Sequence, residues 1–143
     1  MKNITSFVDL LFNFLYKVKK NINSKLNKQA LSITKLKILK IISNSKNYAT
    51  NIKKKMGFSS RTIVSILDNL EKNKLLHRKQ NMKDRRIKDL YITNNGIKKL
   101  REAENINKIM LEDSFSSLDK KQIKTFKEVC NILINNKNSI TKK

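Results

Sequence analysis

The arginines of this chain are confined to one stretch of the sequence. All five of them lie between positions 61 and 101, whereas lysine is abundant throughout a chain that is also rich in Asn and Ile. A guanidinium is planar and donates hydrogen bonds in a fixed fork, which suits phosphate oxygens and the edges of nucleobases. The residues concerned are Arg61, Arg78, Arg85, Arg86 and Arg101. This stretch is therefore the first candidate for a surface that binds an anionic partner.

Residues 60–73 are predicted to form an amphipathic helix that could enter a DNA major groove. Gly57 can take the left-handed position that ends a preceding helix, and Ser59 can cap the free amides of the new one. Apolar residues recur at helical spacing on the inward face, namely Ile63, Ile66, Leu67 and Leu70. The candidate DNA-binding residues are Ser59, Ser60, Arg61, Thr62, Val64, Ser65 and Asn69. An ordinary amphipathic helix with a solvated polar face is the alternative interpretation.

A basic hairpin is predicted directly after this helix. Leu75 and Leu76 start one strand, and Leu90 and Ile92 alternate with polar neighbours in the manner of a half-buried return strand. Residues 77–88 between them hold six Lys or Arg against one acid, a charge density that favours an anionic partner. The DNA-binding candidates here are Arg78, Lys83, Asp84, Arg85, Arg86 and Lys88. A mobile charged loop is the alternative.

Two acidic residues, Asp68 and Asp84, lie where phosphates would approach. A carboxylate beside a phosphate is repelled unless a cation neutralises it. We therefore expect each of them to pair with an arginine, with Asp84 orienting Arg86 across the hairpin tip.

Together these residues resemble the MarR (multiple antibiotic resistance regulator) family of winged-helix transcription factors. The similar motif is D-x-R-x-x-x-hydrophobic-x-hydrophobic-T-x-x-G, found here as Asp84, Arg86, Leu90, Ile92, Thr93 and Gly96. Further similar positions are Leu31, Ser32, Leu39, Leu70, Glu71, Lys72, Leu75 and Arg78. The resemblance implies a mainly α fold with a small β-hairpin wing. It also implies a homodimer in which the helix at 60–73 contacts the major groove and Arg86 the adjacent minor groove of double-stranded DNA.

Four positions depart from the family's usual pattern. Lys74 stands where the family commonly has Gly, Lys53 replaces a small Ala, Tyr48 lies where a Ser or Thr cap is usual, and Ser65 replaces a basic residue. Lys74 is expected to strain or reshape the junction after the helix, with Asn73 as the candidate for the left-handed conformation instead. Ser65 argues against transferring a known operator sequence to this chain.

The remaining residues predict helices on both sides of this region. With 143 residues one domain is expected, in which residues 31–96 form the winged helix-turn-helix and residues 1–30 and 97–138 form dimerisation helices. Within the segment from Ile4 to Ile22, the apolar run at 7–16 is too short and too interrupted by Asp9 and Asn13 to span a bilayer. A core helix is expected near 34–42. Later helices are predicted before a break at 114–118 and after a capping box at Asp119 and Gln122. Residues 138–143 are expected to fray.

The net charge of +22 leaves a second functional class open. Between Lys46 and Arg101 there are 16 basic and four acidic residues, but the rest of the chain is basic as well. The first hypothesis is a sequence-specific transcriptional regulator, a ligand- or stress-responsive repressor that acts as a homodimer on a pseudo-palindromic operator. The alternative is a nonspecific basic nucleic-acid-associated or membrane-surface protein.

Catalysis, metals and cofactors find no support in the composition. The chain has one histidine, His77, and one cysteine, Cys130, so it lacks a His/Cys metal cluster and a convincing nucleophile and base pair. Cys130 falls on an apolar helical seam, where packing is favoured over redox sensing, and a lone thiol fits the reducing cytoplasm. No membrane partner is expected. A small-molecule effector is a candidate partner, in a cleft where the long helix after the wing meets the DNA-binding region.

Overall fold

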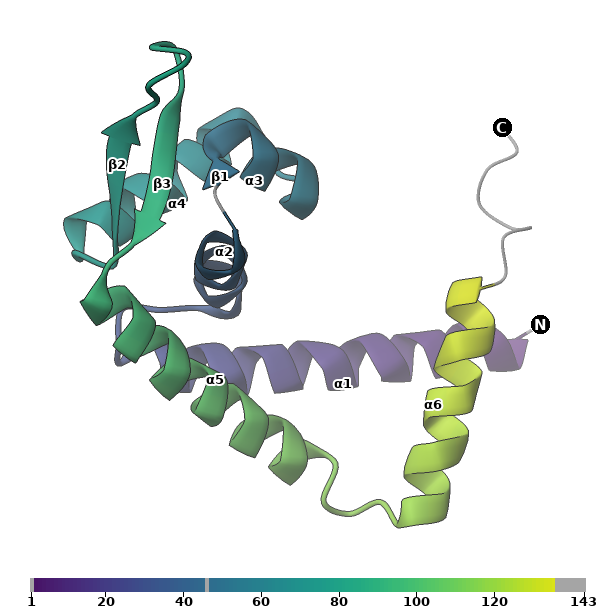
Figure 1. The fold of residues 1–143 in the computed structure, drawn as a ribbon. Coiled ribbons are helices and arrows are strands. Elements are labelled where there is room, and N and C mark those ends of the chain that lie inside the picture. The colour runs from purple at the N-terminus through teal and green to yellow at the C-terminus, as the bar shows by residue number, and fades with distance from the viewer. Residues whose placement is uncertain (1, 46, 136–143) are drawn as a thin grey trace, which may run out of the picture. The chain divides into compact units, whose positions relative to one another are not determined.

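The computed structural model describes residues 2–45 and 47–135 as two compact units, which divide after Met110 (Figure 1). The first unit contains most of the helices and all three strands. The elements in chain order are α1 (Lys2–Asn27), α2 (Ile33–Asn44), β1 (Asn47–Tyr48), α3 (Ala49–Met56), α4 (Ser60–Lys72), β2 (Leu76–Gln80), β3 (Lys88–Ile92), α5 (Asn94–Ser114) and α6 (Lys120–Asn135). The predicted mainly α fold with a small β wing is confirmed.

Helix α2 is the central core element of the first unit, as predicted. Its apolar side chains Leu36, Ile38, Leu39 and Ile42 are all buried. The helix begins at a Ser32 cap, whose hydroxyl accepts a hydrogen bond from the Lys35 amide at 3.2 Å. Because the first turn of a helix leaves amides unsatisfied, the carboxamide of Asn23 in α1 accepts another from the Ile33 amide at 2.9 Å. This bond ties α1 to α2.

The turn between α3 and α4 has the predicted chemistry. Gly57 adopts the left-handed conformation with φ of 68°, and its amide donates to the Lys53 carbonyl oxygen. Ser59 then caps α4 by accepting a hydrogen bond from the Thr62 amide at 3.1 Å. Ile63, Leu67 and Leu70 are buried, while Ile66 is half-buried. One face of α4 is therefore fixed inward by packing, and its opposite face is directed to solvent.

The sheet contains one more strand than the sequence predicts. The sequence predicted no strand at Asn47 and Tyr48, but these two residues pair with β3, giving the strand order β1-β3-β2 with both pairings antiparallel. A two-residue strand is too short to show a hydrophobic period. The Asn47 carboxamide is nevertheless buried and donates to the carbonyl oxygens of Ile41 and Ser45, so it satisfies the end of α2.

The wing, residues 76–92, is joined to α5 by a compact turn at Thr93. The Thr93 hydroxyl donates to the Lys74 carbonyl oxygen at 2.7 Å and accepts from the Gly96 amide at 2.9 Å. Gly96 is buried against the backbone at the start of the wing: a Cβ added there would overlap the Leu75 carbonyl oxygen and lie 2.7 Å from the Ile92 Cγ1. Glycine is therefore required here for close approach, which explains this position of the wing motif.

Lys74 itself takes the left-handed conformation after α4, with φ of 56°. Asn73, the residue expected to do so, remains at φ of −84°, so that expectation was wrong. The reason is the hydrogen bonding of the helix end: the Lys74 amide donates to the Glu71 carbonyl oxygen and the Leu75 amide to the Leu70 carbonyl oxygen. This is the Schellman pattern, which places the left-handed residue immediately after the cap.

The second unit holds the end of α5, a turn and α6. The chain leaves the helix after Ser114, as predicted, and α6 begins at a reciprocal capping box. In that box the Asp119 amide donates to the Gln122 side chain at 2.9 Å and the Gln122 amide to the Asp119 carboxylate at 2.8 Å. The rings of Phe115 and Phe126 lie 6.3 Å apart. Residues 138–143, expected to fray, lie outside the described residues.

Within the described ranges, none of the helices combines the length and the apolar character needed to cross a membrane. The assignment of residues 1–30 and 97–138 to dimerisation stays a prediction.

We predict that Gly96→Ala lowers the free energy of unfolding by about 3 kcal/mol, because the added methyl group meets a backbone carbonyl that cannot move aside cheaply. Gly57→Ala is the control. A Cβ there meets no atom within 4 Å, so only the left-handed backbone costs energy, about 1–2 kcal/mol. Urea unfolding followed by circular dichroism measures both. Equal losses would contradict the close approach at Gly96.

We also predict that Lys74→Gly raises the free energy of unfolding by up to about 1 kcal/mol, because glycine adopts the left-handed conformation without strain. Lys72→Gly, at the last helical position of α4, removes the same charge but should lower the free energy of unfolding by about 1 kcal/mol. The opposite signs distinguish conformational strain from a loss of lysine charge. A Lys74→Gly variant less stable than the wild type would refute the backbone strain proposed at Lys74.

Candidate nucleic-acid interface

The outward face of α4 is a continuous row of polar groups. Twelve of the thirteen predicted DNA-binding residues are exposed, including all seven at positions 59–69. Arg61 and Ser65 lie one helical turn apart on this face, and Asn69 follows one turn later. Val64 is 47% exposed beside them and offers an aliphatic contact of the kind that fits a thymine methyl group. The face therefore combines the donor, acceptor and apolar groups that base edges recognise.

The N-terminal end of α4 is organised by two hydroxyl groups. The Ser59 and Thr62 side chains lie 2.8 Å apart and share a hydrogen bond, while Ser59 also accepts from the Thr62 amide. The remaining amides of the first turn lack intrahelical acceptors by position, and they carry the positive end of the helix dipole. This end is suited to approach a phosphate.

The wing tip is a hydrogen-bonded turn. The Asn81 side chain accepts from the amides of Lys83 and Asp84 at 2.8 and 3.0 Å, and its NH₂ group donates to Asp89. At the other side of the turn, the Gln80 side chain donates to the Arg85 carbonyl oxygen. These bonds hold the backbone of the tip while the side chains of Lys83, Arg85 and Arg86 stay exposed.

Asp84 plays a different part from the one expected. Its carboxylate accepts a hydrogen bond from the backbone amide of Arg86 at 2.9 Å, whereas we expected an ion pair with the Arg86 guanidinium. Its carbonyl oxygen also accepts from the Ile87 amide at 3.0 Å. Asp84 thus shapes the turn that carries Arg86 by bonding to its backbone amide, not to its guanidinium. A side chain two residues from its partner bonds more easily to that partner's backbone than to its distant charged end.

Asp68 does pair with an arginine, as predicted, and the partner is Arg78. The Arg78 Nη2 lies 2.7 Å from the Asp68 Oδ1, and its Nη1 lies 2.6 Å from the Glu71 Oε2. Arg78 is the one predicted DNA-binding residue that is not exposed, with 20% of its side chain accessible. Glu71 was noted in the sequence only among the positions similar to the MarR family, and its role as a partner of Arg78 was missed.

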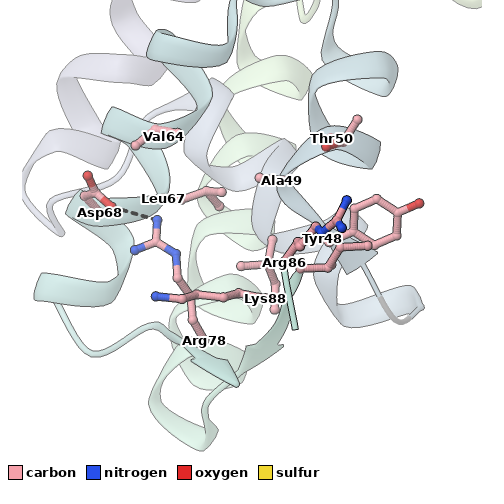
Figure 2. Close-up of a pocket in the computed structure, with 11 residues that line it drawn as sticks. Tyr48, Ala49, Thr50, Val64, Leu67, Asp68, Arg78, Arg86 and Lys88 are labelled. Atoms are coloured by element: carbon pink, nitrogen blue, oxygen red, sulfur yellow. Dashed lines mark ion pairs between the residues drawn. The ribbon is translucent and has the colours of Figure 1, made fainter. Parts of the chain in front are cut away.

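A hollow of about 380 Å³ separates α4 from the wing (Figure 2). Its lining is partly apolar. Figure 2 shows Arg86 of the wing on the side where Tyr48 and Thr50 lie, Arg78 and Asp68 opposite, and Lys88 between them. Its lining residues are Tyr48, Ala49, Thr50, Val64, Leu67, Asp68, Arg78, Arg86, Ile87, Lys88 and Leu90. Tyr48 and Thr50 were not among the predicted site residues, because only β1 pairing brings their segment to the wing.

A second groove, of about 530 Å³, lies between α2 and α5. It is lined by Ile33, Leu36, Lys37, Lys40, Glu104 and Asn107. Lys40 and Glu104 form an ion pair of 2.7 Å across it. The groove lies where the sequence predicted a regulatory cleft, at the meeting of α5 with the core helix of the DNA-binding region.

Other chemistry has little to build on in the part of the chain that the structure describes. No group of three or more His, Cys, Asp or Glu side chains there could hold a metal ion. His77 stacks on Tyr91 with ring centroids 5.4 Å apart, and Cys130 is a half-buried free thiol.

Comparison with known proteins supports the resemblance. The MarR family model matches residues 31–88. Among solved structures, the YusO protein from Bacillus subtilis is 22% identical, with a TM-score of 0.76 over 95% of this chain and 98% of that one. A putative MarR-like transcription regulator from Bacillus cereus is 12% identical, with a TM-score of 0.85 over 96% and 100%.

A further similar structure is a mutant MarR from E. coli complexed with operator DNA, at 16% identity and a TM-score of 0.77 over 92% of this chain and 96% of that one. The search of curated protein sequences returned no match. The sequence match and the fold agree on the same region, since residues 31–88 contain the core helix, the helix-turn-helix and the wing up to β3. Residues 31–88 of this chain therefore match the MarR family model, and the chain has the fold of solved MarR-type transcriptional regulators.

Proposed function

We propose that this protein is a sequence-specific, double-stranded DNA-binding transcriptional regulator that acts in the cytoplasm as a homodimeric repressor. The observation that carries the proposal is the exposed polar face of α4 beside an arginine-bearing wing. A helix of this kind fits the major groove, and a basic hairpin beside it fits the backbone or the adjacent minor groove. The E. coli MarR mutant that shares this fold was solved with operator DNA, which supports the same mode here.

Dimerisation is supported by exposed apolar side chains on helices at both ends of the chain. In α1, Leu10 is 69% exposed and Phe7 is 54% exposed, and in α6 Ile132 is 67% exposed. Large apolar surface of this kind usually marks an interaction site. A two-fold dimer would place two copies of α4 about one helical turn of DNA apart, roughly 34 Å, and so select a pseudo-palindromic operator.

Effector control is proposed at the groove between α2 and α5. Its volume falls within the range typical of small-molecule sites, and its lining joins apolar residues of α2 to Lys37 and Lys40. An anionic, partly apolar molecule matches that lining. Because Lys40 also pairs with Glu104, such a molecule would compete for a contact that joins α2 to α5.

The alternative is a nonspecific basic protein that binds nucleic acid or anionic membranes through its charge alone. The two differ in their response to salt. A regulator retains a preference for one duplex over a scrambled duplex at physiological salt, whereas a nonspecific binder loses affinity for both together. Selection of bound fragments from a random library, followed by this comparison, tests the proposal. Equal affinity for both duplexes at every salt concentration would refute it.

We predict that Arg61→Ala weakens binding to the selected duplex by about 1–3 kcal/mol and relaxes sequence choice, because a base contact is lost. Arg86→Ala should weaken binding to most duplexes, with the greatest loss for narrow minor grooves. Arg101→Ala is the matched control, since it removes the same charge from an exposed site on α5. Fluorescence anisotropy measures the affinities. Unchanged binding by both test variants would show that α4 and the wing are not the interface.

We predict that Leu10→Glu converts the dimer to a folded monomer, because a charge would be buried at the interface while the exposed site in the single chain tolerates it. Thr5→Glu adds the same charge at an exposed position on another side of α1 and should leave the dimer intact. Sedimentation velocity gives the molecular mass. A wild-type monomer, or an unaffected Leu10→Glu dimer, would exclude this surface.

A further inference from the structure

Arg78 connects α4, the helix proposed to contact bases, with β2, the first strand of the wing. Its guanidinium bonds to two carboxylates of α4, at 2.7 Å from Asp68 and 2.6 Å from Glu71. Its backbone amide donates to the other oxygen of Glu71 at 3.0 Å. Glu71 therefore holds both the main chain and the side chain of Arg78. We name this cluster of three residues the Arg78 clamp.

The clamp joins two elements of the first unit. Asp68 and Glu71 lie three residues apart, and so on neighbouring positions of one side of α4, while Arg78 belongs to β2. The backbone between them makes the left-handed turn at Lys74. Arg78 also pairs across the sheet with Leu90 of β3, so a shift of its backbone is transmitted to both strands of the wing.

The charge of the clamp is wrong for a phosphate ligand. One guanidinium stands between two carboxylates, so the cluster carries a net negative charge, and both terminal nitrogens of Arg78 already have anionic acceptors. An incoming phosphate would meet Asp68, which is 57% exposed, before it reached a half-buried arginine. Coulomb repulsion from that carboxylate opposes the contact. By contrast, the cations at the wing tip, Lys83, Arg85 and Arg86, are all exposed.

We propose that Arg78 and Glu71 are positioning residues, which fix the orientation of α4 relative to the wing so that both reach their grooves together. This inference rests on the proposed function. Glu71 accepts from both the backbone amide and the guanidinium of Arg78, and two such bonds set an angle as well as a distance, which a single ion pair does not. The clamp thus determines how well the protein distinguishes its preferred duplex from others, and contributes nothing to binding through phosphate neutralisation.

The decisive variant is Glu71→Gln, because simple electrostatics and the clamp predict opposite changes in the affinity for the selected duplex. Removal of one carboxylate makes the surface more positive, so simple electrostatics predicts tighter binding to every duplex. The clamp predicts weaker binding to the selected duplex, because Gln replaces one of the two acceptor oxygens of Glu71 with an NH₂ donor, which cannot accept from Arg78. We expect the ratio of affinities for the selected and scrambled duplexes to fall about tenfold, the size of one lost base contact.

Glu102→Gln is the matched control. Glu102 also pairs with a cation, Lys99 at 2.9 Å, but both residues lie on α5 and the pair joins no two elements. The hydrogen bond from Lys99 lowers the pKa of the Glu102 carboxyl, so the variant removes a real negative charge at neutral pH. Its affinity ratio should equal that of the wild type.

A charge-neutral double variant separates positioning from phosphate binding. Arg78→Gln combined with Glu71→Gln leaves the net charge unchanged. If Arg78 contacts a phosphate, the salt slope of log K should shrink by about 0.9 for both duplexes. If Arg78 positions α4, the slope is retained while the affinity ratio falls as in Glu71→Gln. Retained binding to the scrambled duplex, with a native circular dichroism spectrum, shows that the variant is folded.

Four outcomes would overturn the proposal. The first is a Glu71→Gln variant that binds both duplexes more tightly, as the loss of a negative charge alone would cause. The second is a reduced salt slope in the double variant, which would make Arg78 a phosphate ligand. In the third, the wild-type protein prefers no duplex at all, which refutes the proposed function and the clamp with it. A wild type that discriminates and variants that discriminate equally would refute the clamp alone.

Discussion

The interface depends on the burial of one edge of α4. Ile63, Leu67 and Leu70 are almost completely inaccessible, so rotation of this helix about its axis would expose apolar surface. Each such side chain gains about 1.5–3 kcal/mol from burial, which far exceeds what any polar group on the outer face could gain by turning inward. Packing therefore decides which residues face outward, and Arg61, Ser65 and Asn69 are presented as a consequence of it.

The ends of α4 complete this constraint. At its start, Gly57 and Ser59 set the direction of the helix relative to α3. At its end, the left-handed Lys74 and the buried Gly96 bring the wing and the first turn of α5 against the same backbone segment. The Thr93 hydroxyl joins these parts by bonding to both the Lys74 carbonyl oxygen and the Gly96 amide. The wing motif is thus partly a folding motif, since Thr93 and Gly96 stabilise the packing of the wing against α5, whereas Arg86 is exposed.

Much of this could be predicted from sequence, because the determining signals are local. Helical spacing located the inward face of α4, and the caps at Ser59 and Asp119 followed from residue type and position.

What could not be predicted depends on contacts between distant segments. The β1 strand forms only because β3 lies beside it, and Arg78 turns away from solvent only because two acids of α4 lie within reach. An arginine in a basic stretch looks the same in sequence whether its partner is a phosphate or a carboxylate. The left-handed residue was misplaced by one position for a similar reason, since the hydrogen bonds of the helix end decide it.

The acids of this basic region show how its charge is arranged. Four acidic residues lie between Lys46 and Arg101, and each accepts hydrogen bonds that shape the DNA-binding region. Asp68 and Glu71 hold Arg78, Asp84 holds the Arg86 amide, and the buried Asp89 accepts from the Asn81 side chain that organises the wing tip. The carboxylates of these four residues thus form bonds within the protein, while the cations of the wing tip remain exposed. The like charges of the wing tip repel one another. The hydrogen bonds to these acidic residues hold the backbone of the tip in place against that repulsion. The same arrangement leaves a positive surface whose shape is set before any partner arrives, which lowers the ordering cost of binding.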